Sequence, residues 1–594
     1  MSWEKHPDPQ LKRNRWFSLN GDWLLNGRSI KVPFCPESKA SEFRGEIGYG
    51  KRDSLVYEKS FELPEYMLEG DKARLILHAD GVDQQCLAVL NGQVVGSHRD
   101  GYLKAVFDLT GKIKPEGENL LKIIALDPIS RDFPYGKQKL KRGGMWYTPF
   151  SGIWKSVWLE AVPERYIKEL KIDWAANSVK FKFNFYDFLG QPFEIRVYRP
   201  ELKCAIQEEQ DRDPEEDEEC WIVAGTVTED FEEEGILVPL EGLRSNLGNE
   251  FILKKWDIDE PWLYDMEITA ANDVIRTYYG FRTVETSTVD GKPVVLLNGR
   301  PVFLHGVLDQ GYYEDSLCLP ESEEEYERDI LRMKEMGFNL LRKHVKTEAD
   351  WFYYYCDIHG MLVMQDMVNS GKYRYIIDTV LPTVGVKLSD DRIRHVADKQ
   401  RKMFENHALG VISQLHDHPS VIAYTIFNEG WGQHRGDSYY EKLKEQEPDR
   451  LFDTASGWFN IRKTDFDSRH IYFRLRDVKP SKRHKNKPIF ITECGGYSMA
   501  VSGHLFDENK GYGYGKCNSV EELTSKIELL YENMVIPGIK NGVCGCIYTQ
   551  ISDIEDEING LYTYDREICK VDKNRMKELA KRIRSAMGGK ELAD

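Results

Sequence analysis

Two glutamates that each follow directly after an apolar run are the residues of this sequence best suited to catalysis. Glu429 comes after VIAYTIFN (421–428), and Glu493 comes after PIFIT (488–492). Short apolar runs of this kind are consistent with buried strands of a parallel sheet. The ends of the strands of a closed barrel meet at one mouth, so the sequence predicts a carboxylate pair there. Ion pairing at the barrel rim is the alternative use of such residues.

A pair of carboxyl groups is what glycoside hydrolysis requires. One group acts as acid and base at the leaving oxygen, and in retaining enzymes the other attacks the anomeric carbon, with the two about 5 Å apart. The attacking carboxylate must stay ionised, which a neighbouring cation favours. Arg342 and His344 end the run FNLLRKH (338–344) and share one face of that strand, so either is a candidate for this cation.

After residue 289, eight apolar runs alternate with amphipathic stretches, as in βα units around a parallel sheet. Eight such units in about 300 residues favour a (β/α)8 barrel over an open sheet. The runs are VFLHGV (302–307), FNLLRKH (338–344), MLVMQD (361–366), VIAYTIFNE (421–429), LFDTAS (451–456), RHIYFR (469–474), PIFITE (488–493) and GCIYTQ (545–550). The stretch 321–337 has a Glu-rich start, an apolar stripe and a closing Gly, which predicts a capped helix.

Two all-β modules are predicted before the barrel. Alternating runs broken every eight to twelve residues favour a β-sandwich within 1–163, and the module at 164–288 has the size of an immunoglobulin-like sandwich. The barrel is assigned to 289–594.

The end of the first module, 143–163, concentrates Trp146, Trp154 and Trp158. An aromatic face packs well on a pyranose, so a sugar platform is one interpretation. Burial of the indoles in a core is the favoured one, because aromatic side chains mostly fill cores.

Charge and composition limit the partners. Lys+Arg 81 against Asp+Glu 98 gives a net charge of −17, which repels nucleic acid and anionic lipid. No run approaches the ~18 consecutive apolar residues of a membrane span. The 11 scattered cysteines and the polar start MSWEKHPDPQ predict free thiols and a cytoplasmic location.

Two segments are expected to be surface loops. EEQDRDPEEDEEC (208–220) is too acidic to bury and lacks the ligand spacing of a calcium loop. The segment 369–395 follows the third barrel strand and holds no clear helix. Over the barrel mouth it would shape the leaving-group side, or it would form an oligomer contact.

Histidine and cysteine pairs give weak metal signals. His416 and His418 precede a strand rather than close it, and the single residue between Cys544 and Cys546 is too short for common zinc spacing. Barrel packing is the expected use of the cysteines, and neither a metal nor another cofactor is predicted.

The chain resembles glycoside hydrolase family 2, the family of β-galactosidases, β-glucuronidases and β-mannosidases, over nearly all of its length. The segments that carry the resemblance are LNGDW (19–23), HRDGYLKAVFDLT (98–110), SGIWKSVWLE (151–160), EPWLY (260–264), YGFRTVE (279–285), LNGRPVFLHGV (297–307), MKEMGFNLLRKH (333–344), HDHPSVIAYTIFNEG (416–430) and ITECGG (491–496). The resemblance implies an N-terminal jelly-roll β-sandwich, an immunoglobulin-like β-sandwich and a C-terminal TIM barrel that is catalytic.

The resemblance also implies residue roles and a retaining exo-β-glycosidase mechanism on a carbohydrate substrate, without a cofactor. Glu429 would be the acid/base and Glu493 the nucleophile. Asn428 would bind the sugar 2-hydroxyl. Tyr472 would donate a hydrogen bond to the nucleophile, and Arg342 would support it.

The sequence departs from the family pattern where the substrate is selected. β-Glucuronidases of the family grip the uronate carboxylate with an Asn-x-Lys motif, whereas no lysine follows Asn559 in EDEINGLYTYDR (555–566). His344-Val345-Lys346 stands in place of His-Tyr-Pro, and Tyr548 stands where tryptophan is common.

A basic run, Arg342, Lys343, His344 and Lys346, lies at the predicted mouth of an otherwise acidic protein. One cation suffices for the nucleophile, so the surplus favours a substrate carboxylate, with β-galacturonide as the sharper hypothesis. The alternative is that Lys343 and Lys346 face solvent or pair with Asp366 and Glu348.

Other polar residues at predicted strand ends are expected to contact distal hydroxyls of the sugar. These are Asp309 and Gln310 after the first strand, and Tyr548, Gln550 and Asp553 from the eighth.

The predicted function is hydrolysis of terminal β-linked, galacto-configured sugars, either a β-galacturonide or a β-galactoside. β-Glucuronidase and β-mannosidase are alternatives within the family, and a non-catalytic carbohydrate-binding protein is an alternative of another class. A metal-dependent barrel hydrolase should have two histidines closing the first strand, where only His305 is found. Assembly into a homo-oligomer is left open.

Overall fold

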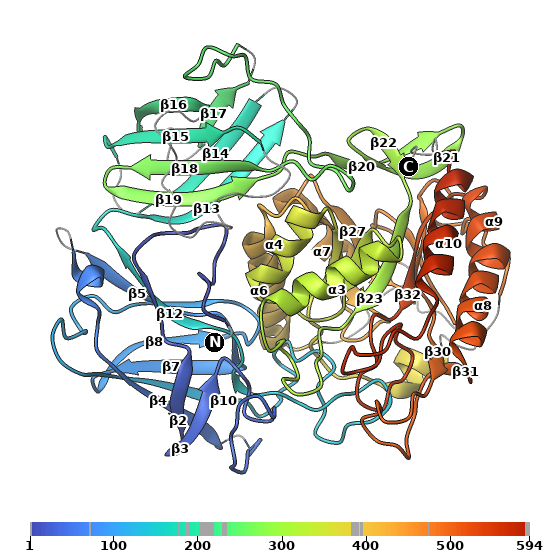
Figure 1. The fold of residues 1–594 in the computed structure, drawn as a ribbon, viewed down its shortest axis with the longest axis horizontal. Helices are drawn as coiled ribbons and strands as arrows, with labels where there is room; N and C mark the ends of the chain where they lie inside the picture. Colours follow the sequence, from blue (N-terminus) through green and yellow to red (C-terminus); the bar gives the residue numbers. More distant parts are fainter. Residues whose placement is uncertain are drawn as a thin grey trace.

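The computed structural model describes residues 3–50, 52–69, 73–175, 178–185, 189–200, 219–228, 235–240, 242–381, 391, 396–457, 459, 461–472 and 475–588. The acidic run lies outside the described residues up to position 218, as do 382–390 and 392–395 of the long segment after the third barrel strand. Two β-sandwiches and a barrel surrounded by helices are visible in Figure 1. The predicted fold class is therefore confirmed.

The first sandwich packs a six-stranded sheet on a four-stranded one. The larger sheet has the order β3 (Arg28–Val32), β2 (Gly21–Leu25), β4 (Ser54–Phe61), β10 (Asn119–Leu126), β7 (Gln85–Leu90) and β8 (Gln93–Arg99). The smaller has the order β1 (Trp16–Ser18), β12 (Val157–Val162), β5 (Arg74–Ala79) and β9 (Ala105–Asp108). Alternation along β10 buries Leu121, Ile123 and Ala125 between the sheets. Short elements complete it: η1 (Glu65–Leu68), β6 (Val82–Asp83) and β11 (Gly152–Ile153).

The second sandwich has the strand count of an immunoglobulin-like domain among its described residues. One sheet has the order β13 (Ile167–Ala175), β14 (Ser178–Phe185) and β17 (Ile236–Pro239). The other has the order β16 (Cys220–Thr226), β15 (Pro192–Tyr198), β18 (Tyr264–Ala270) and β19 (Asp273–Tyr279). A small sheet of β20 (Val284–Val289), β21 (Lys292–Leu297) and β22 (Arg300–Val302) leads into the barrel (Figure 1).

The barrel sheet has eight strands, and every ladder between them is parallel. Its order is β27 (Leu451–Ser456), β26 (Val421–Asn428), β25 (Leu362–Asp366), β24 (Leu340–Lys343), β23 (Leu304–Asp309), β32 (Val543–Thr549), β29 (Ile489–Gly495) and β28 (Asp467–Ile471). Each of the eight predicted runs overlaps one of these strands. β27 and β28 are in contact, which closes the sheet.

Helices surround the barrel (Figure 1). They are α3 (Glu324–Glu335), α4 (Asp350–His359), η2 (Ile376–Val380), α6 (Asp398–Leu415), α7 (Gly436–Gln446), α8 (Val520–Leu530), η3 (Tyr531–Val535), α9 (Ile536–Ile539) and α10 (Lys573–Ala586), with the short strands β30 (Tyr497–Met499) and β31 (Tyr514–Cys517) before α8. In α3, the predicted apolar stripe is buried through Tyr326, Ile330 and Met333. Gly337 ends this turn at φ 86°, and a Cβ there would lie 2.4 Å from Cβ of Ala580, so close packing requires glycine.

Residues near the N-terminus contact the barrel as well as the sandwich that follows them. Trp3 is buried, its backbone N–H donates to Oε2 of Glu323 at 3.0 Å, and its indole N–H donates to the carbonyl of Pro320 at 3.0 Å. The indole of Trp351 donates to the carbonyl of His6 at 3.2 Å. These contacts fasten the start of the first module to the helical layer of the last.

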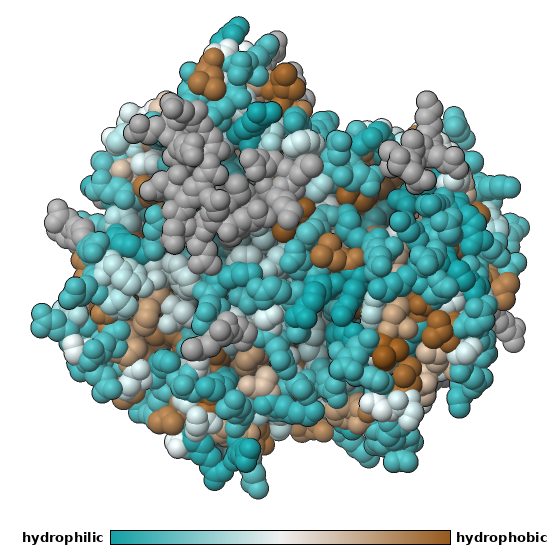
Figure 2. All heavy atoms as spheres, viewed as in Figure 1, coloured by the Kyte–Doolittle hydropathy of each residue, from teal (hydrophilic) through white to brown (hydrophobic). Residues whose placement is uncertain are grey.

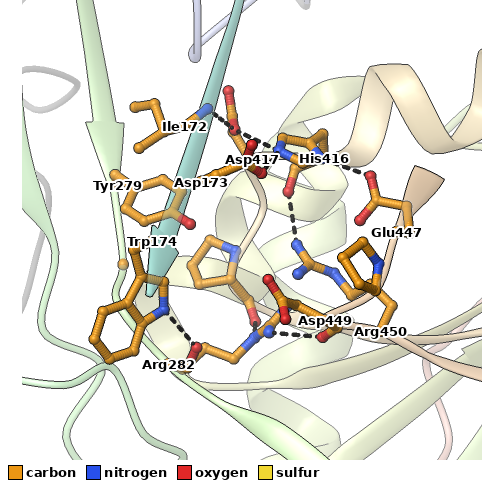
Figure 3. A pocket seen from close by; sticks show the side chains of 13 residues that line it. Ile172, Asp173, Trp174, Tyr279, Arg282, His416, Asp417, Glu447, Asp449 and Arg450 are labelled. Atoms are coloured by element: carbon orange, nitrogen blue, oxygen red, sulfur yellow. Dashed lines mark hydrogen bonds and ion pairs between the residues drawn. The ribbon is translucent and has the colours of Figure 1, made fainter. Parts of the chain in front are cut away.

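The second sandwich meets the barrel at a polar pocket (Figure 3). His416 contacts Glu447 at 2.5 Å through Nδ1 and Asp173 at 3.1 Å through Nε2. Burial lowers the pKa of His416, but its hydrogen bonds to these carboxylates outweigh that effect and raise the pKa to about 10. His418 contacts Asp357 at 2.6 Å. The two histidines thus contact carboxylates of other structural elements.

The sequence predicts no clear helix in 369–395 and buried indoles in 143–163. The described part of 369–395 contains the helical turn η2, so the expectation of no clear helix is wrong; the Asp378 carboxylate accepts the Arg374 backbone N–H at 2.7 Å and stabilises that turn. Trp154 and Trp158 are buried, at 0% and 2% exposure, whereas Trp146 is only half-buried.

Polar side chains cover most of the face in Figure 2, with apolar ones scattered among them. Ten cysteines of the described chain are free thiols, Cys544 and Cys546 among those buried. Within that part of the chain, no helix is long and apolar enough to cross a bilayer.

Candidate active site

The two predicted glutamates lie together at the carboxyl end of the barrel. Glu429 follows β26, and Glu493 lies in β29. A carboxylate oxygen of Glu429, one of Glu493 and a ring nitrogen of His470 all lie within 4.8 Å of one another. This spacing is close to the ~5 Å of retaining glycosidases and shorter than the ~6.5–9.5 Å of inverting ones.

Glu429 leaves its strand through an unusual backbone conformation. Its φ is 49°, in the left-handed region that costs a residue with a Cβ about 1–2 kcal/mol, and Gly430 follows with φ 74°. The Glu429 N–H donates to the carbonyl of Ser456 at 3.0 Å, which fixes the turn. Strained residues of this kind concentrate at functional sites, and here the turn projects the carboxyl group into the mouth, with 20% of the side chain exposed.

Glu493 is surrounded by groups that favour its ionised form. Arg342 Nη1 donates to Oε1 at 3.1 Å, the Tyr472 hydroxyl donates to Oε2, and Nδ1 of His470 lies 3.3 Å from Oε2. Burial raises the pKa of Glu493, but the charges of His470 and Arg342, followed by His344 and the Tyr472 hydrogen bond, lower it to about 2. Near neutral pH this carboxylate is an anion.

Arg342 is fully buried and joins the nucleophile candidate to other site residues. Its Nε and Nη2 each donate to Asp366 at 3.0 Å, and Nη2 also donates to Oδ1 of Asn428 at 2.9 Å. Nη1 donates to the carbonyl of Thr492 at 3.0 Å as well as to Glu493. One planar guanidinium therefore sets the position of both Asn428 and Glu493.

His344 contacts Asp366 at 2.9 Å through Nδ1 and is buried. Burial, reinforced by the charge of Lys137, lowers the pKa of His344 to about 4. Of the two cations that the sequence offered for the nucleophile, Arg342 makes the direct contact, and His344 is neutral near pH 7.

His470 was missed by the sequence analysis. It lies in β28, with Nδ1 2.8 Å from Oε1 of Glu429 and Nε2 3.0 Å from Oγ of Ser456. Ser456 in turn donates to Oγ1 of Thr492 at 2.9 Å. The His470 ring thus lies between the carboxyl groups of Glu429 and Glu493, and its hydrogen bond with the Ser456 hydroxyl fixes its orientation. The only signal in the sequence is a histidine two residues before Tyr472.

Two models of protein families match the chain. The model described as "Glycosyl hydrolases family 2, TIM barrel domain" matches residues 289–583, and the model described as "Glycosyl hydrolase 2 galactose-binding domain-like" matches residues 26–147. The chain belongs to glycoside hydrolase family 2.

Similar curated family 2 sequences are named β-galactosidases. The protein of Enterobacter cloacae is 26% identical over 425 residues, which cover 69% of this chain and 36% of that protein. The protein of Oenococcus oeni is 24% identical over 492 residues, which cover 78% of this chain and 41% of that protein. The chain therefore spans about two fifths of the length of these relatives.

Solved structures match the fold over nearly the whole chain. An uncultured Clostridium sp. β-glucuronidase has a TM-score of 0.71 at 16% identity, covering 97% of this chain and 99% of that one. The Ruminococcus gnavus β-glucuronidase in complex with D-glucuronic acid has a TM-score of 0.69 at 18% identity, covering 98% and 100%. At these identities the likeness concerns the fold of family 2 alone.

Lys343 and Lys346 are buried and bonded within this family 2 barrel. Lys343 Nζ donates to Asp309 at 2.6 Å and Glu348 at 3.0 Å, and Lys346 Nζ donates to Glu348 at 2.6 Å and to the carbonyl of Gly311 at 2.7 Å. The alternation of a strand directs Lys343 away from the face that Arg342 occupies. Pairing with Glu348, one of the alternatives left by the sequence, is what the structure has; pairing with Asp366 is not, because that carboxylate contacts Arg342 and His344.

The remaining predicted pocket residues are buried, and most of them bond to other side chains of the chain. Gln310 donates to the Tyr147 hydroxyl at 2.7 Å and to Gln550 at 2.5 Å. Tyr548 has no exposed surface, and Asp553 pairs with Lys570 at 2.6 Å. Among the described residues, none of these side chains has a hydrogen bond or ion pair with Glu429 or Glu493.

Two groups of side chains in the described residues have ligand atoms near enough to hold a metal ion. One is Glu429, His470 and Glu493, and the other is His504, Asp565 and Glu567. In the first, both oxygens of Glu493 already accept hydrogen bonds, and a guanidinium lies 3.1 Å away. With Arg342 already beside Glu493, this arrangement suits a transition state that carries partial positive charge on the sugar better than it suits a bound metal ion.

Proposed function

We propose that the chain is a retaining β-glycosidase that removes terminal β-linked, galacto-configured sugars. The observation that carries the proposal is a carboxyl pair within 4.8 Å whose members have unlike surroundings. Glu493 is held as an anion by Arg342 and Tyr472, and Glu429 is partly exposed on a left-handed turn. The β-galactosidase names of similar sequences support the galacto configuration.

In the first step, Glu493 attacks the anomeric carbon while the glycosidic C–O bond breaks, and Glu429 gives its proton to the leaving oxygen. A covalent glycosyl ester and a free alcohol result. Asn428, whose Oδ1 accepts a hydrogen bond from Arg342, binds the 2-hydroxyl in this proposal, where hydrogen bonds strengthen in the transition state.

In the second step, Glu429 removes a proton from water, the water oxygen bonds to the anomeric carbon, and the ester bond to Glu493 breaks. The anomeric configuration is restored, and both carboxyl groups return to their starting protonation states. The Tyr472 hydroxyl and Arg342 stabilise the departing carboxylate.

Ordinary β-glucuronidase specificity is the second candidate, and the structure supports it less. Asn559 accepts from Gln550 at 2.7 Å and donates to Glu557 at 2.9 Å, and it is buried. Its side chain is thus engaged within the loop after β32, and no lysine follows it to complete the uronate motif.

The roles are tested with Glu493→Ala and Glu429→Ala on an aryl β-galactoside with a good leaving group. Each variant should lose about 10³-fold or more in turnover. Azide should restore turnover by filling the space of the missing carboxyl group. It should give the β-glycosyl azide with the Glu429 variant and the α-glycosyl azide with the Glu493 variant. Unchanged turnover in the Glu493 variant would refute the mechanism, and a first product of α configuration from the unaltered enzyme would refute retention.

A further inference from the structure

A loop of the first sandwich, between β10 and β11, lies across the mouth of the barrel. The backbone N–H of Tyr135 donates to the carbonyl of Asn369 at 3.0 Å, and its hydroxyl donates to the carbonyl of Gly371 at 2.7 Å. Gly136 has φ 60°, and a Cβ there would lie 3.1 Å from the carbonyl oxygen of Val345. The loop therefore passes directly over the carboxyl ends of β24 and β25.

The other side of this loop is anchored to the opposite part of the mouth. The backbone N–H of Tyr147 donates to the carbonyl of Lys137 at 3.1 Å. The Tyr147 hydroxyl donates to Glu557 at 2.5 Å and accepts from Gln310 at 2.7 Å. Gln310 follows β23 and Glu557 follows β32, so Lys137 is held between four strand ends.

Lys137 differs from the other lysines of the mouth in having no anionic partner among the described residues. Its side chain is half-buried, and Nζ lies 5.9 Å from the centre of the Tyr147 ring. Lys343 and Lys346, by contrast, both bond to Glu348. A half-buried ammonium group loses hydration, and a charge-assisted hydrogen bond to a ligand anion would replace it.

Lys137 lies close enough to His344 for its charge to lower the pKa of that ring. After burial, this charge is the largest cause of the low pKa of His344. His344 and Arg342 share the carboxylate of Asp366, and Arg342 contacts Glu493. Lys137 thus belongs to a loop that passes over the end of β24, the strand whose Arg342 contacts Glu493.

We propose that Lys137 binds the carboxylate of a uronide glycone, so that the preferred substrate is a β-galacturonide rather than a β-galactoside. This inference rests on the proposed glycosidase function. An ammonium group forms a charge-assisted hydrogen bond with a carboxylate, and the carboxylate is the group that distinguishes a galacturonide from a galactoside. Lys137 would bind the substrate carboxylate in place of Lys343 and Lys346, because the ammonium groups of those two lysines are already bonded to carboxylates of the chain.

The test compares 4-nitrophenyl β-galacturonide with 4-nitrophenyl β-galactoside, and includes 4-nitrophenyl β-glucuronide as a third substrate; all three share one leaving group. The enzymes are the unaltered protein, Lys137→Met, Lys137→Arg and the control Lys139→Met. Lys139 is exposed, and its ammonium lies 5.3 Å from the Trp146 ring. The measured quantity is the ratio of kcat/KM for the galacturonide to that for the galactoside.

The ratio should exceed one in the unaltered enzyme and fall about 10- to 100-fold in Lys137→Met, the loss expected for one hydrogen bond to a charged group. Lys137→Arg should retain most of it, and Lys139→Met all of it. Free galacturonate should inhibit the unaltered enzyme more strongly than galactose, a measurement that needs no variant to fold.

The inference is overturned if the unaltered enzyme prefers the galactoside, or if Lys137→Met lowers both substrates equally; the proposed glycosidase function stands in both cases. If neither substrate is cleaved and neither sugar inhibits, the galacto-specific function and the inference fail together. A preference for β-glucuronide over both would keep the carboxylate contact and overturn the galacto configuration.

Discussion

The substitution His470→Gln removes the imidazole ring that lies between the two carboxyl groups while keeping a side chain of similar reach. Nδ1 of His470 is 2.8 Å from Glu429 and 3.3 Å from Glu493. Burial opposes ionisation of Glu493, and the charge of His470 is the largest of the effects that nevertheless lower its pKa to about 2. An opposite charge at this range is worth about 1–3 pKa units, or roughly 1.4–4 kcal/mol.

Because Glu493 must be ionised to attack, raising its pKa moves the acid limb of kcat/KM to higher pH. The unaltered enzyme should show no limb from this group above about pH 3, whereas His470→Gln should show one between roughly pH 3 and 5. Loss of the hydrogen bond to Glu429 should also lower kcat about 10- to 100-fold at the optimum.

The assay is kcat/KM on an aryl glycoside from pH 3 to pH 8, with His504→Gln as the matched control. His504 also contacts a carboxylate, Asp565, at 2.6 Å, and among the described residues it has no bond to Glu429 or Glu493. Coincident pH profiles for His470→Gln and the unaltered enzyme would refute the conclusion that His470 lowers the pKa of Glu493.

Four further expectations follow from the same contacts. Tyr472→Phe removes a donor to Glu493 and should lower kcat about 10- to 100-fold with less effect on KM, measured by steady-state kinetics; a change in KM alone would contradict this. His416→Gln should lower stability by about 3 kcal/mol below pH 6.5, and the difference should disappear as pH rises through the folded-state pKa of about 10, since the raised pKa contributes stability only while the ring is charged; melting temperatures across this range test it. Lys343→Met should destabilise the protein by about 3–5 kcal/mol without changing the galacturonide preference, and an altered preference would restore the role that the sequence suggested. Dialysis against a chelator should leave kcat/KM unchanged, because both oxygens of Glu493 accept hydrogen bonds from the chain; activity that is lost and then returns with a divalent cation would contradict this.

The barrel and the glutamate pair were predictable because both depend on local patterns. A buried parallel strand is a short apolar run, and its carboxyl end is marked by the first polar side chain. LFDTAS (451–456) coincides with β27, whereas RHIYFR (469–474) was placed two residues late relative to β28 (Asp467–Ile471). Tyr472 follows the strand and turns toward Glu493, so an aromatic residue that extends the apolar run is not part of the ladder.

The rest of the site depends on contacts between distant segments. His470 is 41 residues from Glu429, and nothing near it in the sequence signals a partner. Lys137 belongs to another module and reaches the mouth only because its loop docks on the barrel. Lys343 and Lys346 were open to two interpretations, because the sequence gives the sign of a charge but not which carboxylate will lie beside it.

The attachment of Trp3 to Glu323 affects how the protein is made. Ribosomes add about 5–20 residues per second, so a contact separated by 320 positions waits roughly 16–64 s for its partner to be synthesised. During that interval the buried indole has no barrel to enter and is available to chaperones or to other nascent chains. Slowing translation before the segment that contains Glu323 should therefore increase aggregation of the unfinished polypeptide, and Trp3→Ser should reduce it at the expense of the finished enzyme's stability.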